Sequence, residues 1–208
     1  MALGYVIKVA LVIAGLISCR HSEVAQSPLQ QVEEPVKTEP QKVDTSICAV
    51  TDLKESLDAI IDAVDAENCA QALEKLAEEE VIDLSHLQIR SAAILSQLHK
   101  VRELDLGYNQ INSLKGLGKL KELRVLTVDN NKIRDLEELR SLKNLVWLNV
   151  AANQIEDVSP LSQLPNLVKL DLTGNKVRDL SPLKDLVNLS ELQLEGNPIA
   201  KKPATCPR

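Results

Sequence analysis

Residues 101–111 read VRELDLGYNQI, and the same phrase returns four times further along the chain. The later copies are LRVLTVDNNKI, LVWLNVAANQI, LVKLDLTGNKV and LSELQLEGNPI, beginning at residues 123, 145, 167 and 189. Each copy has an asparagine at the same place, 22 residues after the previous one: Asn109, Asn131, Asn153, Asn175 and Asn197. A fixed period of this length is the signature of a protein built from stacked repeats.

One unit, residues 123–144, shows what each turn of the stack contributes. Leu126 and Val128 alternate with polar neighbours, which predicts a short strand with one buried face. After Asn131 the apolar residues recur about every three positions, which indicates an irregular or helical return segment. A single turn cannot bury its own apolar face, so stacked turns share a core and their strands form a parallel sheet.

The repeated asparagine is predicted to lie inside a sharp turn of the chain. Its amide group both donates and accepts hydrogen bonds, so it can satisfy buried backbone N–H and C=O groups. The preceding unit, IDLSHLQI, has Leu87 at this position. We expect that unit to mark the transition from the repeats to a cap.

The pattern LxxLxLxxNxI resembles the bacterial leucine-rich-repeat proteins with 22-residue units, the class of the internalins and of phosphatase-regulator repeats. The resemblance covers about residues 80–199, and it extends to the SPL tripeptides at 159–161 and 181–183 and to the ending GNPI followed by TCP. It implies an α/β leucine-rich-repeat solenoid, with a curved parallel sheet on the concave side and short helical or irregular segments on the convex side. It also implies a role in protein binding.

The N-terminus predicts export and a lipid anchor. The apolar run Val9–Leu16 is too short to span a bilayer, so residues 1–18 are expected to be a signal peptide. The tetrapeptide LISC at Leu16–Cys19 resembles the lipobox of bacterial lipoproteins, which implies lipidation of Cys19; an ordinary secretory signal is the alternative. The expected location is the bacterial cell envelope, lipid-anchored to a membrane at the outer membrane or the cell surface.

Two segments separate the signal from the repeats. Residues 19–47 are rich in Pro, Gln and Glu and are expected to form a disordered tether. Residues 48–79 change to helical periodicity, with Thr51 as an N-cap and Asn68 with Gln71 as a capping box, which predicts a helical N-terminal cap. The repeats then fill residues 80–199, and 200–208 is a C-terminal tail.

Four cysteines fit this arrangement. Cys48 and Cys69 both lie in the cap of an exported protein, so they are expected to form a disulfide. Cys206 is left over, and is either free or paired with another molecule. No CxxC or HxxxH spacing occurs, so no metal site is expected.

Composition argues against several functions. The net charge is −6, and removing residues 1–18 takes away Lys8 and gives −7, which disfavours nucleic-acid binding. No nucleophile motif accompanies the three histidines, so neither catalysis nor a cofactor is expected. Asp83, Asp105 and Asp171 share one strand position and are interpreted as a solvated acidic strip rather than as a catalytic or cation site.

The concave face is the expected binding surface. Strand side chains alternate, so residues on either side of an inward leucine must point outward. The only tryptophan, Trp147, falls at such a position in the middle of the array. The predicted partner-binding residues are Trp147, Tyr108, Val125, Val146, Asn149, Lys169 and Asp171.

These features predict a membrane-tethered module that captures a protein partner on the concave face, and they do not predict an enzyme. Two alternatives remain open: a regulator that occludes the active site of an enzyme, and a structural protein of envelope assembly. Both use the same architecture, so the repeat pattern cannot separate them.

Lipidation gives the first testable expectation. Growth with a radiolabelled fatty acid should label the protein, and Cys19→Ala should abolish the label and release the protein from membranes. A Cys19→Ala protein that is still labelled and membrane-bound would refute the lipobox.

Overall fold

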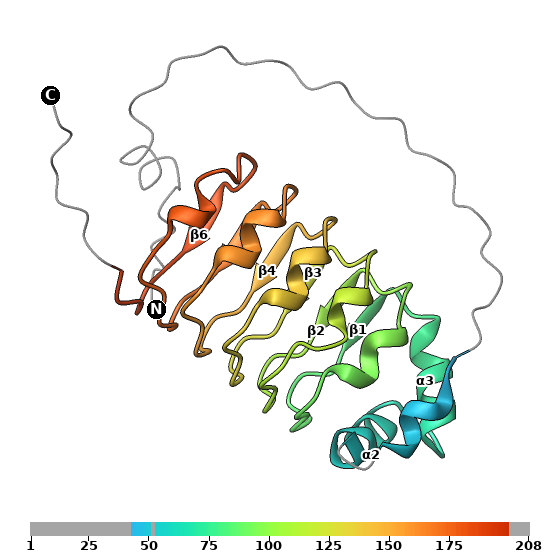
Figure 1. Cartoon of the computed structure of the whole chain (residues 1–208). Coiled ribbons are helices and arrows are strands. Elements are labelled where there is room, and N and C mark those ends of the chain that lie inside the picture. The colour runs from blue at the N-terminus through green and yellow to red at the C-terminus, as the bar shows by residue number, and fades with distance from the viewer. Residues whose placement is uncertain (1–42, 51–52, 200–208) are drawn as a thin grey trace, which may run out of the picture.

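The computed structural model describes residues 43–50 and 53–199, and it shows one continuous array of stacked turns (Figure 1). Six parallel strands form a single sheet in chain order. Their bounds are Val81–Asp83 (β1), Glu103–Asp105 (β2), Val125–Thr127 (β3), Trp147–Asn149 (β4), Lys169–Asp171 (β5) and Glu191–Gln193 (β6). The predicted leucine-rich-repeat solenoid is therefore confirmed.

Strand register follows the repeat without a shift. Leu126 pairs with Leu104 on one side and with Leu148 on the other, so equivalent residues lie side by side across the sheet. These central leucines are buried, while the residues that flank them are exposed or half-buried. The alternation predicted from the sequence is thus the one observed, and the apolar core runs the length of the array.

The return segments are short 3-10 helices on the other side of the core (Figure 1). They are Ala93–Gln97 (η3), Leu117–Lys119 (η4), Glu137–Ser141 (η5), Ser159–Gln163 (η6) and Ser181–Leu183 (η7). Such turns need more room per repeat than strands spaced about 4.8 Å apart. The array therefore curves, with the sheet on its concave side.

A serine or aspartate introduces each of these helices. In the third repeat Asp135 accepts a hydrogen bond from the backbone N–H of Glu137 at 2.8 Å. The other repeats use the same side-chain turn at the same position, through Ser91, Ser113, Asp157 and Asp179. A side chain that bonds two residues onward fixes a turn locally, so each return segment begins at a defined residue.

The repeated asparagines form the predicted ladder, in which four side chains are buried and that of Asn197, in the last repeat, is half-buried. Asn153 is 7% exposed and accepts a hydrogen bond from the N–H of Ile133 in the previous repeat at 2.9 Å. Its amide nitrogen donates to the carbonyls of Val128 and Val150 at 2.9 and 3.1 Å. All five asparagines make the equivalent bonds, namely Asn109, Asn131, Asn153, Asn175 and Asn197.

A second ladder runs along the surface. Asn144 donates through its side chain to the carbonyl of Lys121 at 2.9 Å, Asn166 donates to Lys143, and Asn188 donates to Pro165. All three side chains are exposed. Each of these repeats thus has two asparagine side chains that donate to a backbone carbonyl of the previous repeat, one in the core and one exposed to solvent.

The first repeat is covered by a small helical cap. It consists of Thr45–Ala49 (η1), Lys54–Ala63 (α2) and Cys69–Ala77 (α3), and a disulfide joins Cys48 to Cys69 with a Cα separation of 5.9 Å (Figure 1). The inward side chains continue the core of the repeats: Leu57, Ile60, Leu73 and Leu76.

Two details of the cap differ from the expectation. The Asn68 side chain accepts from the N–H of Gln71 at 3.0 Å as predicted, but the Gln71 side chain accepts from Glu67 rather than from Asn68. The N-cap position of α2 is occupied by Leu53 without a side-chain cap, and Thr51 lies outside the described residues.

The predicted tether, residues 19–47, is wrong at its C-terminal end. Residues Thr45–Ala49 form a 3-10 helix, in which the Asp44 side chain accepts from the N–H of Ser46 and Ile47 packs against the core. The Gln97 side chain also pairs with both backbone groups of Asp44, at 2.5 and 2.6 Å. That contact joins positions 53 residues apart, so local composition could not reveal it.

Several predictions fall on residues that the structure does not describe. The signal peptide, Cys19, the tether before residue 43, and the tail 200–208 with Cys206 all lie outside the described residues. Among the helices that are described, none has the length and apolar character needed to cross a membrane.

The two asparagine ladders allow a matched test of burial. Asn153→Ala should lower the free energy of unfolding by about 1–3 kcal/mol, because it leaves buried backbone groups unpaired. Asn144→Ala removes an exposed amide, and the carbonyl group that it leaves can bond to water instead. This change should alter the free energy of unfolding by no more than about 0.5 kcal/mol. Urea unfolding monitored by circular dichroism gives both values, and equal losses would contradict the assigned role of the buried amide.

The cap disulfide closes a loop between positions 21 residues apart. Replacing Cys48 and Cys69 by serine should lower the free energy of unfolding by about 3 kcal/mol in the loop-entropy model. Adding a reductant should lower the urea midpoint of the wild type and leave that of the double variant unchanged. If the reductant leaves the wild-type midpoint unchanged, the bridge does not stabilise the cap.

Candidate functional site

The concave sheet presents the one tryptophan of the chain to solvent. Trp147 begins β4, between Val125 of β3 and Lys169 of β5, and is 44% exposed. Its neighbours Leu145 and Leu148 are fully buried. The buried leucines fix the backbone, so the indole ring can face only the concave side.

Two valines lie next to Trp147, one along the chain and one across the sheet. Val146 directly precedes the strand and is 37% exposed, and Val125 is half-buried on the neighbouring strand. Together with the indole ring they form the apolar patch, defined as Val125, Val146 and Trp147. An exposed aromatic side chain flanked by aliphatic groups is the usual centre of a protein-binding hot spot.

A small hollow of about 110 Å³ adjoins the other side of the indole ring. Lys169 and Glu191 lie in its wall and form an ion pair with an N–O distance of 3.0 Å, in which both side chains are about half exposed. Asp171 and Gln193 complete the polar part of the lining. The hollow thus combines one aromatic wall with charges of both signs.

The carboxylates of the next column are turn residues as well as surface charges. Asp83, Asp105 and Asp171 each accept a hydrogen bond from the backbone N–H two residues onward, at 2.7–2.9 Å. Asn149 makes the same bond to Ala151 at 3.1 Å. These side chains therefore have a structural role in addition to lining an acidic strip, because they fix the turn that follows each of these strands.

The environments of two of these carboxyl groups differ. Hydrogen bonds from the backbone and the side chain of Ser85 hold the pKa of Asp83 below its usual value. Burial raises the pKa of Asp105, against the lowering effect of the Gly107 N–H, and the nearby Asp83 and Asp129 carboxylates raise it further. Negative charge therefore accumulates at this end of the concave face.

Tyr108 follows β2, two strands away from Trp147 in β4. Its ring stacks on that of His86, with centroids 4.4 Å apart and an interplanar angle of 11°. The sequence-based predictions do not include this pairing of the two rings. The available signal was their 22-residue spacing, since residues one repeat apart lie side by side in a parallel stack.

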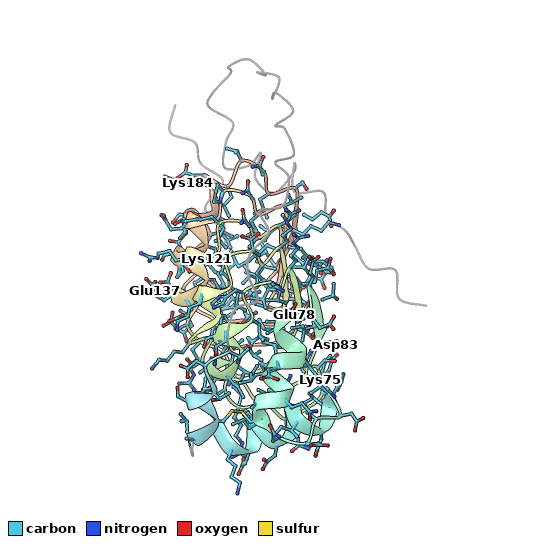
Figure 2. The ribbon with its side chains drawn as sticks, turned by 90° about the vertical axis from the view of Figure 1, so that its right-hand side faces the viewer. Lys75, Glu78, Asp83, Lys121, Glu137 and Lys184 are labelled. Atoms are coloured by element: carbon cyan, nitrogen blue, oxygen red, sulfur yellow. A yellow bond between two sulfur atoms is a disulfide. The ribbon has the colours of Figure 1, made fainter. Side chains whose placement is uncertain are left out.

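Charged groups also cover the helical side. Figure 2 shows Lys121, Glu137 and Lys184 on that side of the array and Asp83 on the opposite, sheet side. Within residues 43–50 and 53–199, no group of three or more His, Cys, Asp or Glu side chains is arranged to hold a metal ion.

Comparison with known proteins agrees with this architecture. Residues 99–141 and 143–185 match the family described as leucine-rich repeats (2 copies). A search of curated proteins found no match.

Solved structures give several similar folds. An internalin C2 from Listeria monocytogenes is 36% identical with a TM-score of 0.58, and the match covers 59% of this chain and 54% of that one. An internalin from the same organism is 29% identical with a TM-score of 0.54, and the match covers 56% of this chain and 34% of that one. A leucine-rich-repeat protein from Leptospira interrogans is 27% identical with a TM-score of 0.56, and the match covers 62% of this chain and 40% of that one.

The matched region thus spans between 34% and 54% of the length of these structures, and the likeness is one of the repeat array. Leucine-rich repeats generally mediate protein–protein interaction and are typically not enzymes. The chain carries leucine-rich repeats, and its described part is a leucine-rich-repeat solenoid with internalin-like structural neighbours.

Proposed function

We propose that this protein is a binding module that captures a protein partner on the concave face of its repeats. The observation that supports the proposal most directly is Trp147, a large aromatic side chain held outward by buried neighbours. Its counterparts one repeat away are Val125 and Lys169, so the fold does not require an aromatic residue there. Tryptophan is among the residues most enriched in interface hot spots.

The surroundings of Trp147 suit a protein surface better than a small molecule. The adjoining hollow holds about 110 Å³, well below the roughly 300–1,000 Å³ of drug-sized ligand pockets. An apolar patch with a charged rim, formed here by Lys169, Asp171 and Glu191, is the usual anatomy of a protein interface. We therefore place Trp147, Val125, Val146, Asn149, Lys169 and Asp171 in the contact surface.

We further propose that the module is tethered to a membrane of the bacterial cell envelope. The support is the LISC tetrapeptide at Leu16–Cys19, which resembles a lipobox, and the Pro-rich segment that follows it. The segment between Cys19 and the cap, about 23 residues, would as a flexible chain have a root-mean-square span of roughly 25 Å. Such a tether would allow the concave face to reach partners near the membrane without fixing its orientation.

Trp147→Ala tests the binding surface. Loss of a hot-spot aromatic should weaken partner binding by about 2 kcal/mol or more, some thirtyfold in affinity. The free energy of unfolding should fall by only about 1 kcal/mol or less, because the ring is outside the core. Pull-down from envelope extract, followed by affinity measurement on the recovered protein and a thermal midpoint, checks both expectations.

Val187 provides the matched control, since it is an apolar side chain that is 89% exposed and occupies the repeat position of Lys121 on the helical side. Val187→Ala should leave partner recovery unchanged. If both variants recover the partner as well as the wild type does, the concave face is not the binding surface.

A further inference from the structure

Two exposed aromatic rings stack beside the first two strands of the concave face. His86 follows β1 and Tyr108 follows β2, and their rings lie nearly parallel with centroids 4.4 Å apart. Tyr108 is 55% exposed, and the His86 side chain is also exposed. The pair therefore offers an aromatic surface to solvent.

The fold favours other residues at these positions. His86 and Tyr108 have φ values of 61° and 54°, in the left-handed region that suits glycine and asparagine. The same repeat position holds Gly174 and Gly196 later in the chain, with φ values of 68° and 75°. Turn geometry thus gives no reason for aromatic side chains here, so the stack calls for another explanation.

Carboxylates lie close to Gly107, the residue before Tyr108. A side chain at Gly107 would begin only 2.8 Å from Asp129 Oδ1 and 3.1 Å from Asp105 Oδ1, so these two carboxylates converge over the residue next to Tyr108. Asp83 adds a third negative charge nearby, as its effect on the pKa of Asp105 shows. None of the five ion pairs among the described residues involves these carboxylates.

An aromatic face beside paired carboxylates suits a guanidinium group better than an ammonium group. A guanidinium is planar, stacks on aromatic rings, and donates to carboxylates through a fixed fork of N–H groups. We propose that the His86–Tyr108 stack, with Asp105 and Asp129, is a docking surface for an arginine side chain of the protein partner. This inference extends the proposed function by naming a chemical feature of the partner.

The docking surface and Trp147 can contact one partner together. Tyr108 follows β2 and Trp147 lies in β4, so two strand spacings of about 4.8 Å separate them across the sheet. An interface of ordinary size buries about 800 Å² on each protein, which is enough to cover both places.

The test uses the full chain and two fluorescent peptides, one with four arginines spaced by glycine and one with four lysines in their place. Fluorescence anisotropy should show the arginine peptide binding at least threefold more tightly. Tyr108→Asn, which substitutes the residue found at position 130 of the next repeat, should weaken that binding about tenfold. Equal binding of the two peptides, or no loss in Tyr108→Asn, would overturn the proposal.

Non-specific attraction by an acidic protein is excluded with two double variants of equal charge. Asp105→Asn with Asp129→Asn should weaken arginine-peptide binding about tenfold, whereas Glu137→Gln with Glu138→Gln on the helical side should change it less than twofold. Equal losses would mean that net charge alone attracts the peptide, and the proposal would be wrong.

The Asp105→Asn change should not unfold the protein. Asn149 makes the same turn bond at the equivalent position, and the pKa of Asp105 is raised, so its charge disfavours the folded state near neutral pH. The thermal midpoint of the Asp105→Asn single variant should therefore be no lower than that of the wild type.

The peptide experiment can fail separately from the proposed function. If Trp147→Ala abolishes partner capture and the wild type does not bind the arginine peptide, only the arginine inference fails. If Trp147→Ala still captures the partner while Tyr108→Asn loses the arginine peptide, only the role of Trp147 fails.

Discussion

Every turn of this molecule depends on one buried amide. The chain must reverse at the end of each strand, and that reversal places backbone N–H and C=O groups in a core made of leucine and isoleucine. An unpaired group there is costly, and the asparagine satisfies groups from two successive repeats at once, as Asn153 does for the N–H of Ile133 in the previous repeat and the carbonyl of Val150 in its own. The stack is therefore held together by directional bonds as well as by apolar contact.

Polar side chains at the surface also fix the backbone of each repeat, in addition to the buried asparagines. Aspartate or asparagine residues fix the turn after most strands, and serine or aspartate residues fix the start of each 3-10 helix. Because these short-range bonds set the backbone, the outward positions of the strands are free to vary. One column of the sheet therefore holds four different side chains without disturbing the fold, namely Glu103, Val125, Trp147 and Lys169.

Much of this architecture is predictable from sequence, because residues 22 positions apart are neighbours in the stack. Contacts between distant parts of the chain therefore follow from the repeat alone. The inward leucines, the asparagine ladder and the exposure of Trp147 all follow from position within the 22-residue unit. Features without a repeat are different. The contact between Asp44 and Gln97 joins the cap to the first return segment, and nothing in the composition of residues 19–47 indicates it. The 22-residue spacing makes His86 and Tyr108 neighbours, but the stacking of their rings and the hollow beside Trp147 depend on side-chain conformations that spacing does not specify.

The direction of the asparagine bonds has a consequence for the ends of the array. Each asparagine reaches back to groups 20 and 25 residues earlier, so a repeat is completed by the one that follows it. Asn109 accordingly bonds to the N–H groups of Leu87 and Ile89, and the first unit folds with no asparagine of its own. A unit can thus be removed or duplicated as a whole, because the new neighbour offers the same groups. Loss of residues 123–144 would place Trp147 beside Glu103. The concave face would then be shorter by one strand, so its length changes by whole strands.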